Sequence, residues 1–322
     1  FAAIERQMDD SDSLALDDDE EDLAYLDDEE SAFERFHDAR QQNQKERKRA
    51  EAVRTLTDGT EELGAAHEMT YKAARHEKVW LTESLGTFYD QSLLSDVLFL
   101  VKGGKEANCY CCEPHPALAE MTGLSRIAAK VYRPRMLRNL RQDFVYRENR
   151  TVLTAEGKSV KNSDTRIMKA LGKKTAFGAQ VAHTSWLMHE FNALGELHAA
   201  GAYVPRPLAS GENALLMEFI GTEERAAPAL SEVALTLTQA REALKQVRKT
   251  LGHFKERGWV QGDLSAFNIL WHEGRAVFID FPQVIRLEQN PNAEMILQRD
   301  LTRVAEYFQK CGLSEVTPES LW

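Results

Sequence analysis

One short stretch, residues 262–280, constrains this chain more than any other. It begins Gly-Asp-Leu-Ser-Ala-Phe-Asn-Ile-Leu and ends Phe-Ile-Asp. Upstream of it, from Thr236 to Arg257, apolar residues recur at steps of three or four, which predicts a long amphipathic helix. The stretch itself predicts a loop and then a hairpin of two short strands, Ile269–Trp271 and Ala276–Ile279. A packed helix that leads into a polar loop and a hairpin is therefore the framework that the rest of the fold must accommodate.

The polar residues of this stretch are of the types that phosphoryl transfer needs. Asp263, Asn268 and Asp280 are predicted to lie around the loop and the hairpin. A carboxylate can orient a hydroxyl nucleophile and accept its proton, while an amide oxygen and a second carboxylate can hold Mg²⁺. The spacing Asp-x₄-Asn is that of the protein-kinase catalytic loop, and the later aspartate matches its metal-binding position. The alternative is a polar turn, and the combined spacings argue against it.

A second candidate is Lys130, which lies in the apolar run from Ile127 to Tyr132. Alternation along a strand puts Ala128 and Lys130 on one face, where the small residue leaves room for an adenine ring and the lysine can reach phosphate oxygens. A lysine inside an apolar strand is costly unless its charge is paired. Glu190, on the inward side of the next predicted helix, is the expected partner. The alternative is an edge-strand lysine that reaches solvent.

Two further segments are weaker candidates for contact with a nucleotide. The turn at residues 103–108 can cradle phosphates through its backbone N–H groups, although it is neither a full glycine-rich kinase loop nor a Walker A sequence. The strand that ends near residue 220 lies where two lobes should join. The alternatives are an ordinary hairpin turn and an ordinary buried strand. The candidate residues are Gly104, Lys105 and Glu106 in the turn and Met217, Glu218 and Ile220 in the strand.

Hydrophobic periodicity divides the chain into two regions of unlike composition that meet near residue 221. The first predicts mostly strands and the second mostly helices. In order, the predicted elements are a helix within 66–94, strands 97–101, 108–112 and 125–132, a helix over 184–200, strands 206–209 and 214–219, and, around the hairpin, helices 236–257 and 293–311. This order predicts an α+β fold of two lobes, with a ligand cleft between them.

The charges are unevenly distributed along the chain. The net charge is −11, yet residues 1–30 alone hold 14 acids and one base, so we expect a disordered acidic arm there. Residues 31–65 are also charged and predict an exposed helical connector. Between Arg133 and Lys174 there are 12 bases and four acids, which we interpret as a solvated loop. The alternative for this basic block is a surface for phosphate-rich partners.

Composition excludes several classes of protein. No apolar run approaches the ~18 residues of a membrane span, and the acidic N-terminal region is unlike a signal or transit sequence. Four cysteines in 322 residues exclude a disulfide scaffold and favour a reducing, cytoplasmic compartment. Cys109, Cys111 and Cys112 lie near His115 and could suggest a zinc site. Strand alternation turns Cys112 away from the other two, so buried thiols are expected instead.

Taken together, these residues resemble the RIO family of atypical serine/threonine protein kinases over roughly residues 70–312. The most specific pieces are Gly104–Asn108, Lys130–Tyr132, Gly262–Asn268 and Ile279–Gln283. The resemblance implies a trimmed bilobal kinase fold. Such a fold has a small antiparallel N-lobe sheet with one helix, a helical C-lobe and an N-terminal helical extension. The resemblance also implies the use of ATP with Mg²⁺ or Mn²⁺.

The resemblance also implies roles for individual residues. Lys130 would bind ATP with Glu190 as its structural ion-pair partner, Asp263 would be the catalytic aspartate, and Asn268 and Asp280 would hold the metal. Family members are also thought to form an aspartyl-phosphate, here on Asp280, so the resemblance implies ATPase activity as well as kinase activity. The expected partners are ATP, an unidentified protein substrate and a pre-ribosomal or other RNA–protein assembly, with no membrane.

The expected domain limits follow from the resemblance and the charge distribution. In order, they are an acidic tail at 1–30, a connector at 31–65, a kinase domain at 66–312 and a C-terminal tail at 313–322. Within the kinase domain we expect a helical extension at 66–95, an N-lobe at 96–220 and a C-lobe at 221–312.

The sequence departs from the family in the catalytic loop. Gln261 stands where the family usually has a histidine, two residues before the catalytic aspartate. Because that residue supports the loop rather than performing chemistry, the change bears on rate and not on class. Three functions stay open: a RIO-type kinase, an ATPase-driven assembly factor and a small-molecule phosphotransferase. The turn Gly104–Asn108 and the short C-terminal lobe argue against the third.

Overall fold

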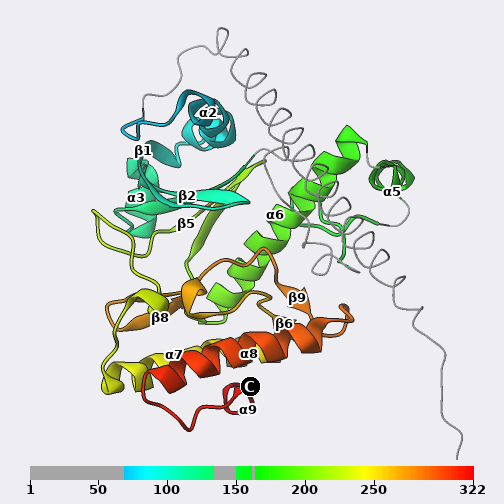
Figure 1. Ribbon diagram of the computed structural model, residues 1–322. Helices are drawn as coiled ribbons and strands as arrows, with labels where there is room; N and C mark the ends of the chain where they lie inside the picture. The colour runs from blue at the N-terminus through cyan, green and yellow to red at the C-terminus, as the bar shows by residue number, and fades with distance from the viewer. Residues whose placement is uncertain (1–68, 134–149, 162–163, 174) are drawn as a thin grey trace, which may run out of the picture. The chain divides into compact units, whose positions relative to one another are not determined.

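The computed structural model describes residues 69–133, 150–161, 164–173 and 175–322 (Figure 1). The acidic arm, the charged connector and the first part of the basic block were predicted from sequence and lie outside these residues. All described residues belong to one compact unit. Within them, no helix has both the length and the apolar character needed to cross a bilayer.

The N-lobe is built on a five-stranded sheet whose neighbouring strands are all antiparallel. The strand order is β1-β2-β3-β5-β4. The strands are β1 (Leu94–Gly103), β2 (Ala107–Pro114), β3 (Ile127–Tyr132), β4 (Pro207–Ser210) and β5 (Ala214–Glu218). The sequence predicts all five within a few residues of their observed bounds, because each is a short apolar run between turn residues.

The central strand β3 separates two different environments because its side chains alternate between two faces. Ile127, Ala129 and Val131 pack in a core with helix α2 (Arg75–Asp90), which lies on one face of the sheet (Figure 1). On the other face, Tyr132 packs against helix α6 (Ala176–Ala199). Lys130 therefore lies on the α6 side, as the alternation predicts.

Three helical features of the N-lobe are absent from the sequence prediction. Helix α3 (Pro116–Thr122) follows β2, and helix α5 (Thr165–Gly172) lies inside the basic block. Helix α6 begins at residue 176 rather than 184, with Thr175 capping its first turn. The loop part of the solvated-loop interpretation is therefore wrong for residues 165–172, which form α5. This helix carries apolar side chains at Ile167, Met168 and Leu171, but none of its residues is buried.

The C-lobe is organised around the predicted amphipathic helix α7 (Leu237–Glu256). Thr236 and Gln239 form the predicted capping box at its start, and Gly258 has a positive φ of 62° after its end. The other elements are η3 (Leu230–Glu232), β6 (Trp259–Val260), η4 (Ala266–Asn268), the hairpin β7 (Ile269–His272) and β8 (Arg275–Phe278), β9 (Ile285–Arg286), α8 (Ala293–Lys310) and α9 (Pro318–Leu321). The buried faces of α7 and α8 contribute to one core.

The last residues of the chain pack on this same core. Leu313, Val316 and Leu321 are buried in it, and the side chain of Arg248 on α7 donates hydrogen bonds to Ser320. The domain limits given above stay a prediction. Residues 313–322, which were expected to form a separate tail, contribute to the hydrophobic core of α7 and α8.

Candidate active site

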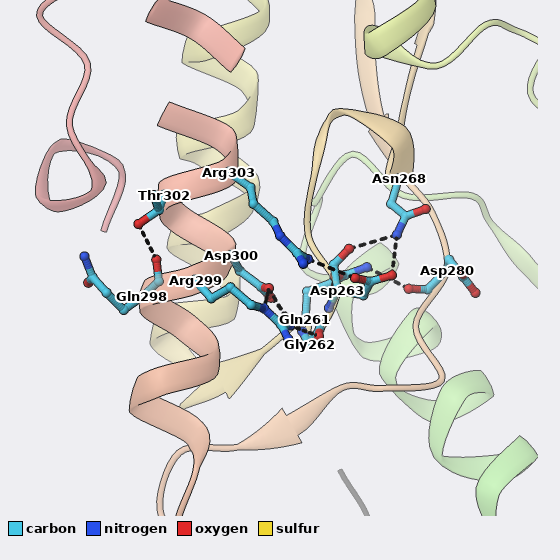
Figure 2. A network of polar contacts seen from close by, with 10 residues as sticks. All are labelled: Gln261, Gly262, Asp263, Asn268, Asp280, Gln298, Arg299, Asp300, Thr302 and Arg303. Carbon is cyan, nitrogen blue, oxygen red and sulfur yellow. Dashed lines mark hydrogen bonds and ion pairs between the residues drawn. The ribbon is translucent and has the colours of Figure 1, made fainter. Parts of the chain in front are cut away.

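The loop that carries Asp263 is closed by hydrogen bonds within it (Figure 2). It leaves β6, runs from Gln261 to Asn268 and ends in the short helix η4. The side-chain amide of Asn268 donates to the backbone oxygen of Asp263 at 2.8 Å and to its carboxylate at 3.4 Å. Asn268 is buried, whereas the Asp263 side chain is 50% exposed. The loop thus presents one carboxylate to solvent on a fixed backbone.

Gly262 fixes the loop to the C-lobe at a position that only glycine can occupy. Its φ is 93°, and a Cβ atom there would lie 2.2 Å from the backbone oxygen of Gln283. Its backbone N–H donates to the buried carboxylate of Asp300 at 3.0 Å. Asp300 belongs to α8, and burial raises its pKa although Arg299 and backbone donors oppose that shift.

Gln261 links the catalytic loop to the backbone that carries Asp280. Its side-chain N–H donates to the backbone oxygens of Asp280 at 2.7 Å and Ile279 at 3.2 Å. Its side-chain oxygen accepts from the N–H of Asp263 at 2.8 Å (Figure 2). The side chain is buried. These contacts are structural, which agrees with the expectation that the residue at this position supports the loop.

Lys130 is paired with two carboxylates, of which the sequence predicts one. Its Nζ lies 2.6 Å from Glu190 and 2.6 Å from Asp280. Burial by itself would lower the pKa of Lys130, but the two carboxylates outweigh it and raise the pKa well above its usual value. The lysine therefore stays charged, and it joins the N-lobe sheet to the hairpin of the C-lobe.

Glu190 is held by more partners than the sequence suggests. It is buried on α6, and its second carboxylate oxygen accepts a hydrogen bond from the hydroxyl of Tyr132. The backbone N–H of Phe281 approaches its first oxygen at 3.4 Å. Burial, then the charge of Glu190, raises the pKa of the Tyr132 phenol, which stays a neutral donor. The position of Tyr132, two residues after Lys130 on the same face, could have revealed this contact.

Asp280 lies immediately after the hairpin in an unusual backbone conformation. Its φ is 69°, which is uncommon for a residue other than glycine. The N–H of Ile279 donates to the backbone oxygen of Asn268 at 2.9 Å, so the two loops are joined just before Asp280. The Asp280 side chain is 45% exposed even though one of its oxygens contacts Lys130. Its carboxylate is therefore held by the lysine and is also accessible to solvent.

The predicted glycine turn joins β1 to β2. The N–H of Gly104 donates to the backbone oxygen of Ala107 at 2.9 Å, and a Cβ atom on Gly104 would lie 2.6 Å from that oxygen. Lys105 is exposed, and the backbone oxygen of Glu106 accepts from the N–H of Arg133. Cys109 lies opposite Lys130 in the β2–β3 ladder, so the turn is a few residues from the lysine along the sheet.

The candidate residues predicted where the two lobes join, Met217, Glu218 and Ile220, lie at or just after the end of β5. Met217 is in register with Ala128, on the strand that carries Lys130. The carboxylate of Glu218 accepts from the N–H of Arg206 at 3.1 Å, so this side chain supports the edge of the sheet. Ile220 is buried in a small apolar cluster. The backbone N–H of Glu218 donates to the backbone oxygen of Arg206 at 2.8 Å.

Two arginines near the site have no counterpart in the sequence prediction. Arg303 on α8 forms an ion pair with Asp263 at 3.1 Å (Figure 2). Arg150, in the described part of the basic block, donates to the backbone oxygen of Pro282 at 3.3 Å and to that of Val284. The 3- and 4-residue spacing of Arg299, Asp300 and Arg303 on α8 is the one signal that could have pointed to a polar face there.

The donor set fits a hard cation better than zinc. Within the described ranges, no group of three or more His, Cys, Asp or Glu side chains is placed to hold a metal. Burial raises the pKa of the Cys109 thiol to about 12 and that of Cys111 to about 11, and all four thiols are free. Asn268 and the partly exposed Asp280 instead offer amide and carboxylate oxygens, which are the ligands that Mg²⁺ prefers.

Comparison with known proteins gives a consistent result. The model of the RIO domain family matches residues 145–321. The RIO-type serine/threonine-protein kinase Rio1 of Haloferax volcanii is 38% identical over 128 residues, which are 40% of this chain and 43% of the relative. Human serine/threonine-protein kinase RIO3 is 33% identical over 135 residues, 42% of this chain and 26% of the relative. The matched segments thus span less than half of either curated relative.

A solved structure gives a more distant match. It is the Rio2 kinase of Chaetomium thermophilum in an ADP/Mg²⁺-phosphoaspartate complex, 19% identical, covering 72% of this chain and 60% of that chain with a TM-score of 0.48. The family match is the stronger result, because it spans more than half of this chain and includes Glu190, Asp263, Asn268 and Asp280. This chain belongs to the RIO domain family.

Proposed function

We propose that this chain is an ATP- and Mg²⁺-dependent serine/threonine protein kinase of the RIO type. One observation carries the proposal: Lys130 pairs with Asp280 at 2.6 Å, and the backbone of Asp280 is joined through Gln261 to the loop that presents Asp263. A cation that can neutralise phosphate oxygens and a carboxylate that can orient a hydroxyl are thereby held in one network.

Each residue of this network has a proposed role. Lys130 binds phosphate oxygens of ATP, and Glu190 positions it. Asp263 orients the substrate hydroxyl and accepts its proton, while the amide N–H of Asn268 holds the carboxylate in place. Asn268 and Asp280 would hold Mg²⁺, which neutralises phosphate charge when bound. The turn Gly104–Glu106 and the strand end Met217–Ile220 are proposed to contact the nucleotide through their backbones.

Labelled phosphate transfer from γ-labelled ATP to a general acceptor protein tests this function. Asp263→Asn should reduce transfer by about 10²- to 10⁴-fold, because it removes the proton acceptor. Nucleotide affinity should change by no more than a few-fold, since Asp263 is not proposed to bind ATP. Asp164→Asn, an exposed residue before α5, is the matched control. Transfer by Asp263→Asn at the wild-type rate would rule out this role.

A second candidate function is ATP hydrolysis through an acyl-phosphate on Asp280, which would serve an ATPase-driven assembly factor. The observation that favours it is the 45% exposure of a carboxylate already held by Lys130. A carboxylate oxygen of Asp280 would attack the γ-phosphorus, and the bond from that phosphorus to the bridging oxygen would break, releasing ADP. Water would then hydrolyse the acyl-phosphate to inorganic phosphate.

The chemical stability of the label separates the two candidates. An acyl-phosphate is lost on treatment with hydroxylamine and is not formed by Asp280→Ala. Label that resists hydroxylamine and maps to serine would support the kinase alone. Membership of the RIO family makes the small-molecule phosphotransferase the least favoured of the three functions.

The cellular context is also a proposal. A cytoplasmic location rests on the four free thiols and the resemblance. On the ground of the same resemblance, we propose a protein substrate and a pre-ribosomal or other RNA–protein partner. Co-sedimentation of the full chain with ribosomal precursor particles tests the partner, and its absence from every particle fraction would contradict it.

A further inference from the structure

A cavity of about 370 Å³ lies against a face of α6 that the mechanism does not use. That face carries His189, Asn192 and Glu196, which recur at helical spacing. The other walls come from residues 150–159 of the basic block and residues 284–290, which follow the β7–β8 hairpin. The volume is within the range of about 300–1,000 Å³ that small-molecule sites occupy. The Lys130 cluster does not line it, so the cavity is separate from the site described above.

Two guanidinium groups in the walls are held in place without a ligand. Arg150 donates to the backbone oxygens of Pro282 and Val284, and Arg286 lies over the ring of Trp259 at 5.6 Å. Side chains that are already ordered lose less conformational entropy when they bind an anion. Among the described residues that line the cavity, Glu196 is the one carboxylate, so the lining carries a net positive charge.

His189 contributes a polar group but no charge. Its Nε2 lies 2.6 Å from the backbone oxygen of Thr151, and since a carbonyl oxygen can only accept, this nitrogen carries the hydrogen. Burial, together with the nearby Arg150 and Arg286, lowers the pKa of His189 to about 4 despite that hydrogen bond. The histidine is therefore neutral at pH 7, and the positive charge of the cavity comes from the two arginines.

We propose that this cavity binds the phosphate group of a small phosphate ester. The planar fork of Arg286 matches phosphate oxygens, and Arg150, whose own fork donates to backbone oxygens, adds positive charge. The walls also supply the hydroxyl of Ser159 and the amides of Asn192 and Gln289. Phosphate alone would fill a small part of about 370 Å³, so space is left for a polar organic group. Glu196 would accept hydrogen bonds from hydroxyls of that group.

The His189 ring proton in the full chain provides a local readout of binding. Its C2–H resonance is assigned by its loss in His189→Gln, and it is followed while glycerol 3-phosphate, inorganic phosphate or acetate is added at constant ionic strength. A saturable shift is expected with glycerol 3-phosphate and, at higher concentration, with inorganic phosphate. This readout does not depend on catalysis, so it is independent of the proposed kinase function.

Two charge variants make the test specific. Arg286→Gln should weaken binding at least ten-fold, because it removes one fork at an exposed position. Glu196→Gln, which removes the opposing charge from the same cavity, should instead tighten binding several-fold. A shift that does not saturate, or equal affinity in Arg286→Gln and the wild type, would overturn the site. Acetate that binds as tightly as phosphate would overturn the choice of phosphate.

Discussion

The catalytic loop, residues 261–268, and the glycine turn, residues 103–107, are both proposed to face ATP but are held in different ways. The catalytic loop is fixed by buried side chains that come from elsewhere, notably Asp300 on α8. The glycine turn is held through backbone hydrogen bonds, from the N–H of Gly104 to Ala107 and from the N–H of Arg133 to Glu106. Neighbouring β1 also shows register shifts along its pairing with β2. The loop proposed to move a proton is thus anchored by a buried side chain of another helix, whereas the turn proposed to cover phosphates is held through backbone contacts.

The largest expected effect on the free energy of unfolding comes from replacing Gly262 of the catalytic loop and Gly104 of the glycine turn with alanine. Gly262→Ala should destabilise the protein by about 3 kcal/mol or more, because it combines a strained positive φ with a clash against fixed backbone. Gly104→Ala should cost about 1 kcal/mol, because the turn can shift to relieve its own clash. Urea unfolding of both variants measures the difference. Equal losses would show that the turn is as rigid as the loop.

Coupling between Lys130 and Glu190 tests whether the N-lobe side of the site is also fixed. Lys130→Met leaves a buried carboxylate without its cation, and Glu190→Gln leaves the lysine with Asp280 alone. Because both changes disrupt one pair, the double variant should lose less than the sum of the single losses, by about 2 kcal/mol. The same urea titrations provide all four values. Additive losses would mean that the ion pair contributes nothing.

The pH dependence of Asp300→Asn tests the buried anchor of the catalytic loop. The pKa of Asp300 is raised in the folded protein, so its protonated form is favoured there. The stability that it contributes is complete below the unfolded pKa of about 4 and is lost as pH rises through the higher folded value. Relative to Asp300→Asn, which does not titrate, the wild type should lose stability over that window.

Unfolding measured at several pH values from 3.5 upwards, in about half-unit steps, is the direct test. The variant keeps an oxygen that can accept from Gly262, so the loop itself should survive. Parallel curves for the two proteins would show that Asp300 carries its ordinary pKa and is not strongly buried.

Arg303→Gln should have the smallest effect. Its ion pair with Asp263 joins side chains that are 42% and 50% exposed, so solvent screens most of the attraction. The free energy of unfolding should change by less than about 0.5 kcal/mol. Urea unfolding of the variant and the wild type, at low and at high salt, measures this difference in the free energy of unfolding. A loss above about 2 kcal/mol would place Arg303 among the anchors of the catalytic loop.

Sequence patterns predict the parts of this fold that depend on local periodicity. Residues close together in the sequence determine the capping box of α7, the alternation of β3 and the apolar runs of the hairpin. Lys130 and Glu190 could be paired in advance because a buried charge needs a partner, and the next helix offers one inward-facing acid.

The contacts that sequence reasoning misses join residues that are distant in the chain. Asp300 and Gly262 are 38 positions apart, and Arg150 reaches Pro282 across 132. Such pairs depend on how elements distant in the chain pack together, for which one sequence carries no local signal. Helix α5 was missed for a different reason, since it is only eight residues long and none of its residues is buried.

The bond between Gly262 and Asp300 has a consequence for the order in which the protein acquires its activity. The catalytic loop precedes α8 in the chain, yet its backbone is anchored by a carboxylate from that later helix. During synthesis the loop therefore emerges before its anchor exists, and closing the intervening 38 positions must wait for α8. A nascent chain that ends before residue 293 would already carry Lys130, Asp263 and Asp280 but not the carboxylate that anchors the loop. Translation thus delays the anchoring of this loop until α8 has been made.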